Sequence, residues 1–480
     1  MKTSWRRGSL VTSLVASLLG TTVARQIPQN QKGPRVVGLD TQRIPAVNPV
    51  RRDELRRRGV AQAGLDNEAT LYFVNVSIGT PAKSLRLHID TGSSDLWVNT
   101  PSSQYCSEIS KPCQYAGAYR ANTSSTYEYI GSYFNISYVD GSGASGDYVS
   151  DTVKFGSTEL DRLQFGIGYN STNAQGILGI GYEINEVQVG RAGLPKYKNL
   201  PAQMVADGLI QSNAYSLWLN DLDASRGNIL FGGIDTAKFT GSLQTLPIQQ
   251  EQGYFAEFLV TLTNVQVSAQ SVSGGDMALG VLLDSGSSLT YLPNNMTNAI
   301  YDIVGAEYDT QAGVAYVPCS LRDVEADFTF TFSGVPIKVA MDELVLNLYD
   351  SNGALATYEN STEPLCLFGI ASAGSGMNVM GDTFLRSAYV VFDLENNEIS
   401  LAQTKFNTTT SSIAEIGIGV DSIPGATKVA DPVAATAGIP GGSQRGSGTT
   451  LNAATGLSGG LVSTAKAVVV AGLVVVFLGV

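Results

Sequence analysis

The chain has 480 residues, of which 43% are hydrophobic and 15% charged, enough apolar content for buried cores and too much for a disordered chain. Its 52 glycines and 21 tyrosines favour strands and tight turns over helices. The single histidine, His88, counts against a Ser-His-Asp or Cys-His site and against most catalytic zinc sites. Asp and Glu are left to do acid-base chemistry, and no metal, cofactor or nucleic-acid partner is expected.

The N-terminal residues 1–24 have the layout of a cleavable signal peptide: a basic start, an apolar run over 10–19, then small residues up to Ala24. The apolar run is too short to span a bilayer, although a membrane anchor is the alternative. Residues 25–58 are basic and end in the arginine clusters 51–52 and 56–58, which predict cleavage by a furin-like convertase.

Charge is divided unevenly along the chain. Residues 1–58 hold 12 Lys+Arg against 3 Asp+Glu, whereas residues 59–452 hold 17 against 39. A basic leader before an acidic body predicts an inhibitory propeptide, held in a cleft partly by charge and weakened when carboxylates protonate at low pH. The alternative is that the arginines serve only as cleavage signals.

The C-terminal end predicts a tethered protein. Residues 406–451 are rich in Ser, Thr, Gly, Ala and Pro and predict a flexible stalk. In 452–480, the small triplet Asn452-Ala453-Ala454, a spacer to Lys466 and an apolar tail form a GPI-attachment signal, with Asn452 as the attachment residue. We therefore expect a GPI lipid to hold the chain at the outer face of the plasma membrane or in the cell wall. Ser458 or Gly459 as attachment residue, and a C-terminal membrane helix, are the alternatives.

Four cysteines and seven sequons accompany the secretory signal. Of three possible connectivities, Cys106–Cys113 and Cys319–Cys366 are expected, and four reduced thiols are the alternative. The Asn-x-Ser/Thr sequons predict N-glycosylation at Asn75, Asn122, Asn135, Asn170, Asn295, Asn360 and Asn407.

A motif occurs twice, 194 positions apart, each time as an apolar strand followed by Asp, a small hydroxyl residue, Gly and two serines. The two copies are 87–94 (Leu-His-Ile-Asp-Thr-Gly-Ser-Ser) and 281–288 (Val-Leu-Leu-Asp-Ser-Gly-Ser-Ser). A second pair follows downstream, Gly-Ile-Leu-Gly at 176–179 and Asn-Val-Met-Gly at 378–381. Two halves with the same ordered motifs imply two similar lobes that each bring one aspartate to a shared boundary.

These residues make the chain resemble the pepsin family of aspartic endopeptidases. The resemblance covers residues 70–405 and rests on the blocks 90–98 (Asp-Thr-Gly-Ser-Ser-Asp-Leu-Trp-Val), 284–288, 381–386 (Gly-Asp-Thr-Phe-Leu-Arg) and 391–393 (Val-Phe-Asp). Together with the leader and the anchor signal, the resemblance points to the fungal yapsin-like, GPI-anchored branch of this family. It implies an all-β, bilobal fold with two similar six-stranded-barrel-type lobes, 59–245 and 246–405, and the active-site cleft between them. It also implies a monomer that cleaves polypeptides.

Asp90 and Asp284 are the predicted catalytic pair. Peptide hydrolysis without a metal or histidine requires water to be deprotonated while the amide is protonated, and two close carboxylates that share one proton can do both. The residues after each aspartate are expected to brace the loops and to donate hydrogen bonds to the carboxylates: Thr91, Gly92 and Ser93, and Ser285, Gly286 and Ser287.

A flap over the cleft is predicted in residues 136–146. By the resemblance, Tyr138 is its tyrosine, Trp97 is the partner of the Tyr138 hydroxyl, and Gly141 and Ser142 lie near the bound substrate. The family's usual glycine after the tyrosine is replaced by Val139.

Asp140, also in the flap, is expected to face the substrate residue before the scissile bond and to favour Lys or Arg there. The alternative is a solvated turn aspartate. His88 is interpreted as a packed polar residue, two positions along the strand from Asp90.

Three alternative functions stay open at this point. A soluble secreted or vacuolar protease of the same family would lack the retained anchor. A cell-wall glycosidase could also use two carboxylates, but it would not explain the duplicated motif, the flap or the propeptide. A non-catalytic pepsin-like binding protein would not need both aspartates and both hydroxyl partners.

Overall fold

The computed structural model describes residues 34–43, 71–138, 142–224, 226–349, 354–358 and 361–440 of the chain. Within these ranges strands far outnumber helices. The all-β class predicted from the sequence is therefore confirmed.

In the described part of the first half, six strands close into a barrel. Each pairs with the next and the last returns to the first: β2 (Tyr72–Ile78), β3 (Lys83–Asp90), β8 (Gly176–Gly179), β4 (Leu96–Asn99), β7 (Thr158–Ser171) and β6 (Gly143–Phe155). β5 (Glu128–Ser137) pairs with β6 outside this ring. Closure leaves no unpaired edge in the barrel, and β8 is buried along its whole length.

The duplicated motif folds as a duplicated strand arrangement. In the first half β3 runs parallel to β8, which is antiparallel to β4, which is parallel to β7. The second half repeats these relations in the strands β16 (Leu279–Leu283), β25 (Val379–Met380), β17 (Thr290–Leu292) and β24 (Ile370–Ser372). β2 and β13 (Leu259–Leu262) flank β3 and β16 as antiparallel neighbours. The internal repeat is therefore structural.

Over its described residues the second half is built from three sheets of its own. Two four-stranded sheets accompany its five-stranded sheet: β15 (Gln270–Ser271), β14 (Asn264–Val267), β20 (Asp327–Phe332) and β21 (Val335–Ala340); β18 (Glu307–Asp309), β19 (Val314–Pro318), β23 (Leu365–Phe368) and β22 (Val345–Asn347). In β20, Phe328, Phe330 and Phe332 are fully buried and the residues between them are partly exposed. Such alternation builds a strand with one side on the core.

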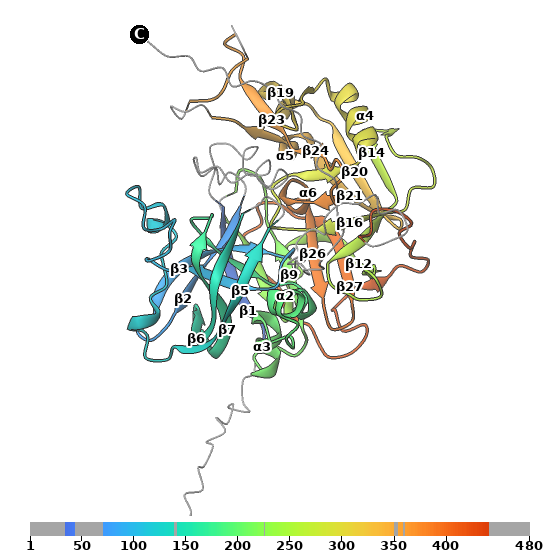
Figure 1. Cartoon of the computed structure of the whole chain (residues 1–480). Helices are drawn as coiled ribbons and strands as arrows, with labels where there is room; N and C mark the ends of the chain where they lie inside the picture. The colour runs from blue at the N-terminus through green and yellow to red at the C-terminus, as the bar shows by residue number, and fades with distance from the viewer. Residues whose placement is uncertain are drawn as a thin grey trace, which may run out of the picture. The chain divides into compact units, whose positions relative to one another are not determined.

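Strands from both halves are neighbours in one sheet. In order, it contains β29 (Thr427–Lys428), β12 (Phe239–Pro247), β27 (Glu398–Thr404), β26 (Ala388–Asp393), β9 (Ala214–Trp218), β10 (Arg226–Phe231) and β1 (Val37–Arg43), and it continues into β2. Figure 1 shows β26 and β27 in orange beside β9 in green. The lobe boundary predicted at 245/246 falls inside β12, so it does not coincide with a break between elements.

β1 comes from the predicted propeptide, residues 25–58. It pairs antiparallel with β10 and meets β2 at its end. Its alternate side chains Val37, Leu39 and Thr41 are buried. A strand ladder and buried side chains therefore hold this part of the segment. The arginine clusters 51–52 and 56–58 lie outside the described residues.

Residues 406–440 differ from the flexible stalk predicted for 406–451. β28 (Ile413–Glu415) pairs with β11 (Gly233–Asp235), β29 pairs with β12, and Ala437 forms a bridge with Leu279. Ile416 is fully buried and Ile423 is 5% exposed. A composition without periodicity suggests flexibility, but widely spaced apolar residues are enough to fix an extended segment on a folded surface. Residues 441–451 lie outside the described ranges.

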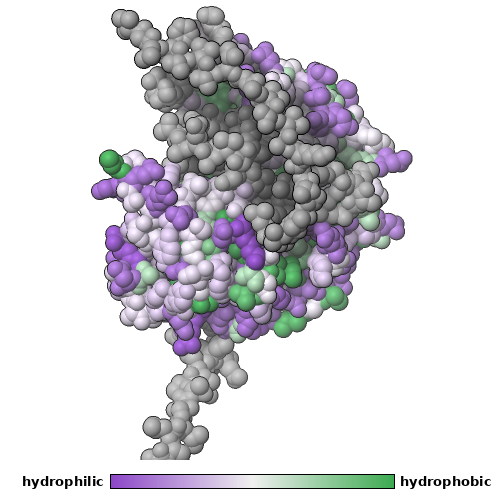
Figure 2. Space-filling model, viewed as in Figure 1, coloured by the Kyte–Doolittle hydropathy of each residue, from purple (hydrophilic) through white to green (hydrophobic). Residues whose placement is uncertain are grey.

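The helices are short: α2 (Val187–Ala192), α3 (Leu200–Ala206), α4 (Asn294–Val304), α5 (Met341–Leu344) and α6 (Asp382–Leu385), with 3-10 turns η1 (Pro112–Gln114), η2 (Ala121–Thr123), η3 (Glu183–Asn185) and η4 (Cys319–Asp323). Gly305 caps the C-terminal end of α4, and its φ of 69° suits a residue without a side chain. In the ranges that the structure describes, no helix is long and apolar enough to cross a membrane. On the face in Figure 2, hydrophobic residues are scattered among hydrophilic ones.

Candidate active site

Asp90 and Asp284 each stand where a buried strand meets a loop. β3 ends at Asp90, and β16 ends one residue before Asp284. Both strands have hydrogen-bonded neighbours on each side, so the core fixes the start of each loop. The two aspartates are 2% and 3% exposed, respectively.

Two hydrogen-bond donors from the same loop orient the carboxyl group of Asp90. The backbone N–H of Gly92 donates to Oδ1 at 2.9 Å, and the hydroxyl of Ser93 donates to Oδ2 at 2.5 Å. The carbonyl oxygen of Asp90 accepts a hydrogen bond from the N–H of Ile180 at 3.0 Å, which ties the loop to the end of β8. Both the side chain and the backbone of Asp90 are therefore fixed.

The second loop repeats this arrangement. Gly286 N–H donates to Asp284 Oδ1 at 2.7 Å, and the Ser287 hydroxyl donates to Oδ2 at 2.7 Å. A Cβ placed on Gly286 would lie 2.5 Å from Asp90 Oδ1 and 2.9 Å from Asp284 Oδ1. The two oxygens are therefore no farther apart than the sum of these distances, and Gly286 has no space for a side chain. The structure thus brings the two predicted carboxyl groups together.

Thr91 and Ser285 connect the loops to each other. The Thr91 hydroxyl donates to the carbonyl oxygen of Leu283 at 3.0 Å and accepts from the N–H of Ser285 at 3.0 Å. Reciprocally, the Ser285 hydroxyl donates to the carbonyl oxygen of Ile89 at 3.1 Å and accepts from the N–H of Thr91 at 3.2 Å. This is the cross-brace predicted from the sequence, with the same bonds made from each side.

His88 is packed beneath this brace. It is 2% exposed, its Nε2 lies 3.3 Å from the carbonyl oxygen of Ser285, and its ring lies 5.9 Å from that of Phe73. This position agrees with the packed polar residue expected at His88.

Tyr138 follows β5 and contacts the first loop region. Its hydroxyl accepts a hydrogen bond from the indole Nε1 of Trp97 at 2.7 Å, as predicted. Burial, and secondarily the charge of Asp90, raise the pKa of Tyr138 well above its ordinary value, so its hydroxyl stays protonated. Both rings lie in an apolar cluster that includes Phe134 and Tyr148.

The tip of the predicted flap is described in part. The N–H of Tyr138 donates to the carbonyl oxygen of Ser142 at 2.8 Å, and Ser142 is 9% exposed. Asp140 and Gly141 lie outside the described residues, so their predicted contacts with substrate stay predictions.

Asp95 is a buried carboxyl group that was not predicted as part of the site. It is fully buried and accepts hydrogen bonds from the hydroxyls of Tyr148 and Tyr197 and from the N–H of Val187. Burial raises the pKa of Asp95, and these three hydrogen bonds oppose the rise. Its place in the block 90–98 is the sequence signal that could have identified it.

Glu186, which follows η3, lies close to Asp95. It is 1% exposed, and its Oε2 accepts the N–H of Tyr197 at 2.8 Å. Its Oε1 has no hydrogen-bond partner among the described residues. Burial raises the pKa of Glu186 to about 10, so the group is neutral at acid and neutral pH. No spacing in the sequence distinguishes it from a surface glutamate.

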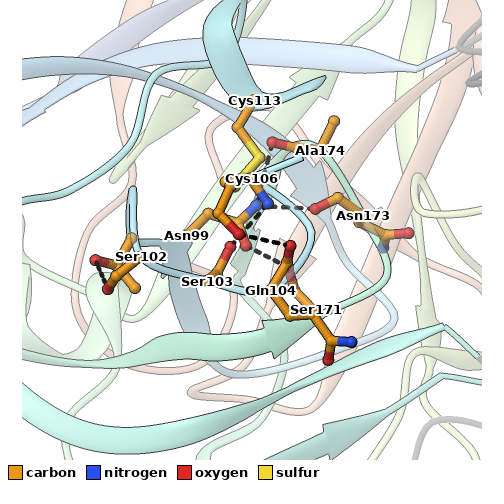
Figure 3. The surroundings of a disulfide bond; sticks show 11 residues. Asn99, Ser102, Ser103, Gln104, Cys106, Cys113, Ser171, Asn173 and Ala174 are labelled. Carbon is orange, nitrogen blue, oxygen red and sulfur yellow. Dashed lines mark hydrogen bonds between the residues drawn. A yellow bond between two sulfur atoms is a disulfide. The ribbon is translucent and has the colours of Figure 1, made fainter. Parts of the chain in front are cut away.

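Both predicted disulfides are present, with Cα atoms 5.2 and 5.0 Å apart, respectively: Cys106–Cys113 and Cys319–Cys366. Figure 3 shows the first of them beside Asn99 at the end of β4. The Asn99 amide nitrogen donates to the carbonyl oxygens of Asn173 and Ala174 at 2.9 and 3.1 Å. The hydroxyl of Ser171 donates to the Asn99 side-chain oxygen at 2.5 Å. The disulfide loop therefore lies next to a hydrogen-bonded junction between β4 and β7.

Six of the predicted glycosylation residues are exposed: Asn75, Asn122, Asn135, Asn170, Asn295 and Asn407. Asn360, the signal peptide 1–24 and the segment 452–480 with Asn452 lie outside the described residues.

Comparisons with known proteins show the family of the chain. A family model described as Eukaryotic aspartyl protease matches residues 71–404. A "Probable aspartic-type endopeptidase opsB" of Aspergillus oryzae is 55% identical over 410 residues, 83% of this chain and 82% of that protein. "Secreted aspartic protease 4" of Candida albicans is 36% identical over 391 residues, 80% of this chain and 88% of that protein.

The solved aspartic proteinase from Irpex lacteus has the same fold, with a TM-score of 0.58 at 21% sequence identity, covering 78% of this chain and 100% of that one. The pepsin-like fold predicted from the sequence is therefore confirmed. With the family model matching most of the chain, this chain belongs to the eukaryotic aspartyl protease family.

Proposed function

We propose that this aspartic-type endopeptidase hydrolyses peptide bonds at acid pH with a water molecule activated between Asp90 and Asp284. One observation carries the proposal: equivalent donors hold the two carboxyl groups, and their Oδ1 atoms converge on one point next to Gly286. Two carboxyl groups this close resist double ionisation, so the pair holds one shared proton over a range of acid pH.

The reaction uses that proton in two steps. The ionised carboxylate takes a proton from the water, whose oxygen attacks the scissile carbonyl carbon, while the protonated carboxyl group donates its proton to the carbonyl oxygen. In the tetrahedral diol that results, the proton taken from water passes to the amide nitrogen, and the C–N bond breaks as one hydroxyl returns its proton to the dyad. An acid and an amine leave, and the dyad keeps one proton as at the start.

The surrounding residues have positioning roles in this scheme. The Thr91–Ser285 brace keeps the loops in register, and Ser93 and Ser287 orient the carboxyl groups. Preorganised donors of this kind lower the barrier because they do not have to reorient during the reaction. The Tyr138 hydroxyl, bonded to Trp97, fixes the base of the flap near the first aspartate loop.

A peptide that carries a statine hydroxyl in place of the scissile carbonyl tests the proposal. Tight inhibition by this analogue, lost in Asp90→Asn and in Asp284→Asn, supports a dyad that binds the tetrahedral species. Asp161→Asn, which changes an exposed carboxylate on β7, is the matched control. If the peptide does not inhibit, or if the ectodomain hydrolyses cell-wall glycans instead, the function is wrong.

We further propose that the protein is synthesised as a zymogen and held at the cell surface by a GPI lipid attached at Asn452. The signal layout of 1–24, the arginine clusters before Gly59 and the apolar tail of 452–480 support this. A phosphatidylinositol-specific phospholipase C should release the enzyme from cells. Retention on membranes after lipase treatment, with secretion of a chain that ends at 451, would indicate a C-terminal membrane helix.

Asp140 is proposed to favour Lys or Arg before the scissile bond, because its place in the flap hairpin faces that substrate residue in the family. An ionised carboxylate meeting a basic side chain in a partly dry cleft would raise kcat/KM about 10- to 150-fold, and the preference would fade below a pH of about 4. Matched Lys and Leu peptides on wild type and Asp140→Ala test it. An unchanged Lys/Leu ratio at pH 6 would make Asp140 a turn residue only.

A further inference from the structure

The start of β16 pairs with a stretch of the C-terminal segment. Ala437 forms a parallel bridge with Leu279. The N–H of Gly280 donates to the carbonyl oxygen of Ala437 at 2.7 Å. The N–H of Thr436 donates to the carbonyl oxygen of Ala278 at 2.8 Å. Because β16 leads directly into the loop of the second aspartate, this contact acts on the strand that carries that aspartate.

The contact lies on the same side of β16 as β25. The N–H of Leu282 donates to the carbonyl oxygen of Asn378, next to β25, at 2.9 Å. The N–H of Gly280, two residues earlier, donates to Ala437. N–H groups two residues apart in a strand point to the same side, and β13 pairs with the opposite side. Residues 436–438 therefore extend the line of β25 to the first residues of β16.

Gly438 and Ile439 fix the end of this contact. Gly438 has a φ of 77°, in the left-handed region. A Cβ on Gly438 would lie 2.5 Å from the carbonyl oxygen of Gly280 and 2.8 Å from the side-chain nitrogen of Asn378, so a larger residue does not fit. Ile439 is partly buried against the core and lies beside Gly280. Close backbone packing and an apolar side chain thus hold residues 436–439, which we call the strap.

The first half has a counterpart of this contact at the same distance along the chain from its aspartate. The N–H of Arg86, four residues before Asp90, donates to the carbonyl oxygen of Ala116 at 2.8 Å. A glycine follows each of the two alanines, and Gly117 and Gly438 have φ values of 81° and 77°. In the first half the alanine precedes β5, whereas in the second half the C-terminal segment supplies it. Each aspartate-bearing strand therefore has an alanine carbonyl as partner at the equivalent residue.

We propose that the strap is a positioning element for the dyad: it sets the place of β16 and thereby the distance between the carboxyl groups of Asp284 and Asp90. The inference rests on the proposed function, because it takes the two carboxyl groups to act as one unit. Two backbone hydrogen bonds and the Ile439 side chain oppose a shift of the start of β16 relative to β25. Misplacement of a reacting group by about 1 Å can lower a rate by about 100-fold.

Release of the strap should change the titration of the dyad as well as its rate. When two carboxyl groups move apart, each resists the charge of the other less. The lower apparent pKa of the pair then rises and the higher one falls. The plateau of kcat between its acid and basic limbs therefore becomes narrower. A residue that only stabilises the fold would lower the unfolding temperature and leave this plateau unchanged.

Gly438→Ala in the full chain tests the proposal, and Gly425→Ala is the matched control. Both glycines lie in the C-terminal segment and have a left-handed φ, 77° and 70°, respectively. A Cβ on Gly425 meets no heavy atom within 4 Å beyond its chain neighbours, whereas a Cβ on Gly438 must push the strap away from Gly280. The two variants therefore separate release of the strap from backbone strain.

For Gly438→Ala we expect kcat to fall about fivefold or more, KM to stay within about twofold, and the plateau of kcat to narrow by about 0.5 pH unit or more. Gly425→Ala should keep the wild-type kcat and plateau. If Gly438→Ala matches Gly425→Ala in both kcat and plateau, the strap does not position the dyad.

Ile439 provides a second variant in case Gly438→Ala does not fold. Ile439→Ala removes the apolar contact of the strap without introducing a clash, and it should narrow the plateau of kcat in the same direction. Ile439→Val keeps most of the contact and should retain most of the wild-type kcat and plateau. In that case, a wild-type kcat and plateau in Ile439→Ala would overturn the proposal.

The dyad is tested separately from the strap. Asp90→Asn should abolish binding of the statine peptide in a chain whose strap is intact. If the peptide binds this variant as tightly as wild type, the proposed function fails and the strap has no dyad to position. If binding depends on Asp90 but the strap variants keep the wild-type kcat and plateau, the positioning role alone is rejected.

Discussion

Thr91 and Ser285 each donate a hydroxyl hydrogen bond to the strand that carries the other, and each accepts the other's backbone N–H. Both residues are buried, so loss of one hydroxyl leaves a carbonyl oxygen and an N–H without partners. Thr91→Val should therefore lower the free energy of unfolding by about 1–3 kcal/mol and kcat by about tenfold or more. Urea unfolding measures the loss of stability, and kinetics with one peptide measure the loss of kcat. Thr91→Ser keeps the hydroxyl and should retain most of the wild-type stability and kcat. Full activity in Thr91→Val would show that the brace is not needed.

The Trp97–Tyr138 hydrogen bond is expected to position the flap. Tyr138→Phe removes the acceptor of the indole N–H while keeping the ring. We expect kcat/KM to fall about tenfold, a change of about 1.4 kcal/mol. The free energy of unfolding should fall by about 1–3 kcal/mol, because the buried indole N–H of Trp97 loses its acceptor. Tyr129→Phe, on an exposed tyrosine of the same hairpin, is the matched control. Equal kinetics for the two variants would remove any role of this bond in the site.

Glu186 should make the folded state less stable as pH rises. Its pKa is about 10 in the folded state against an ordinary 4.5, so the folded state keeps a proton that the unfolded state has lost. The stability contributed by this proton is complete below pH 4.5 and declines progressively as pH rises toward 10, by on the order of 3 kcal/mol at pH 7.

Glu186→Gln should therefore show a smaller loss of stability than wild type between pH 4.5 and pH 7 in urea titrations. Asp161→Asn should follow wild type. If the free energy of unfolding of Glu186→Gln falls with pH as steeply as that of wild type, Glu186 is not the source of the pH-dependent loss of stability.

The C-terminal segment 406–440 should contribute to stability, because its apolar side chains are buried on the body. Ile416 is fully buried, and Ile418, two residues on, is 77% exposed. Ile416→Ala should lower the free energy of unfolding by about 2–5 kcal/mol and open the segment to proteases. Ile418→Ala should change it by less than about 0.5 kcal/mol. Equal effects of the two substitutions on the free energy of unfolding would show that 406–440 is the flexible stalk that its composition predicts.

The sequence predicted the parts of the site that depend on local motifs. The duplicated Asp-(Thr/Ser)-Gly pattern predicted Asp90 and Asp284, their hydroxyl and glycine partners and the repeated strand arrangement, because each motif encodes its own loop. The Trp97–Tyr138 bond and both disulfide pairings followed from the resemblance and the secretory signal.

Residues defined only by tertiary burial were not predicted. Glu186 is an ordinary glutamate in the sequence, and only the packing around it reveals a buried carboxyl group with one oxygen that has no hydrogen-bond partner among the described residues. The segment 406–440 was predicted to be flexible from its composition. Composition does not show that single isoleucines such as Ile416 are buried against the folded body. The predicted lobe boundary falls inside β12. A strand that belongs to a sheet shared by both halves leaves no break in composition from which a boundary could be predicted.

The kcat of Asp90→Asn, Asp284→Asn and the double variant, each measured at its own pH optimum, tests the central claim most directly. In the proposed mechanism the two carboxyl groups act as a unit, so either single change should lower kcat by about 10³-fold or more, and the double variant should be little worse. A single variant that keeps more than about a tenth of the wild-type kcat, or effects that multiply in the double variant, would contradict the account.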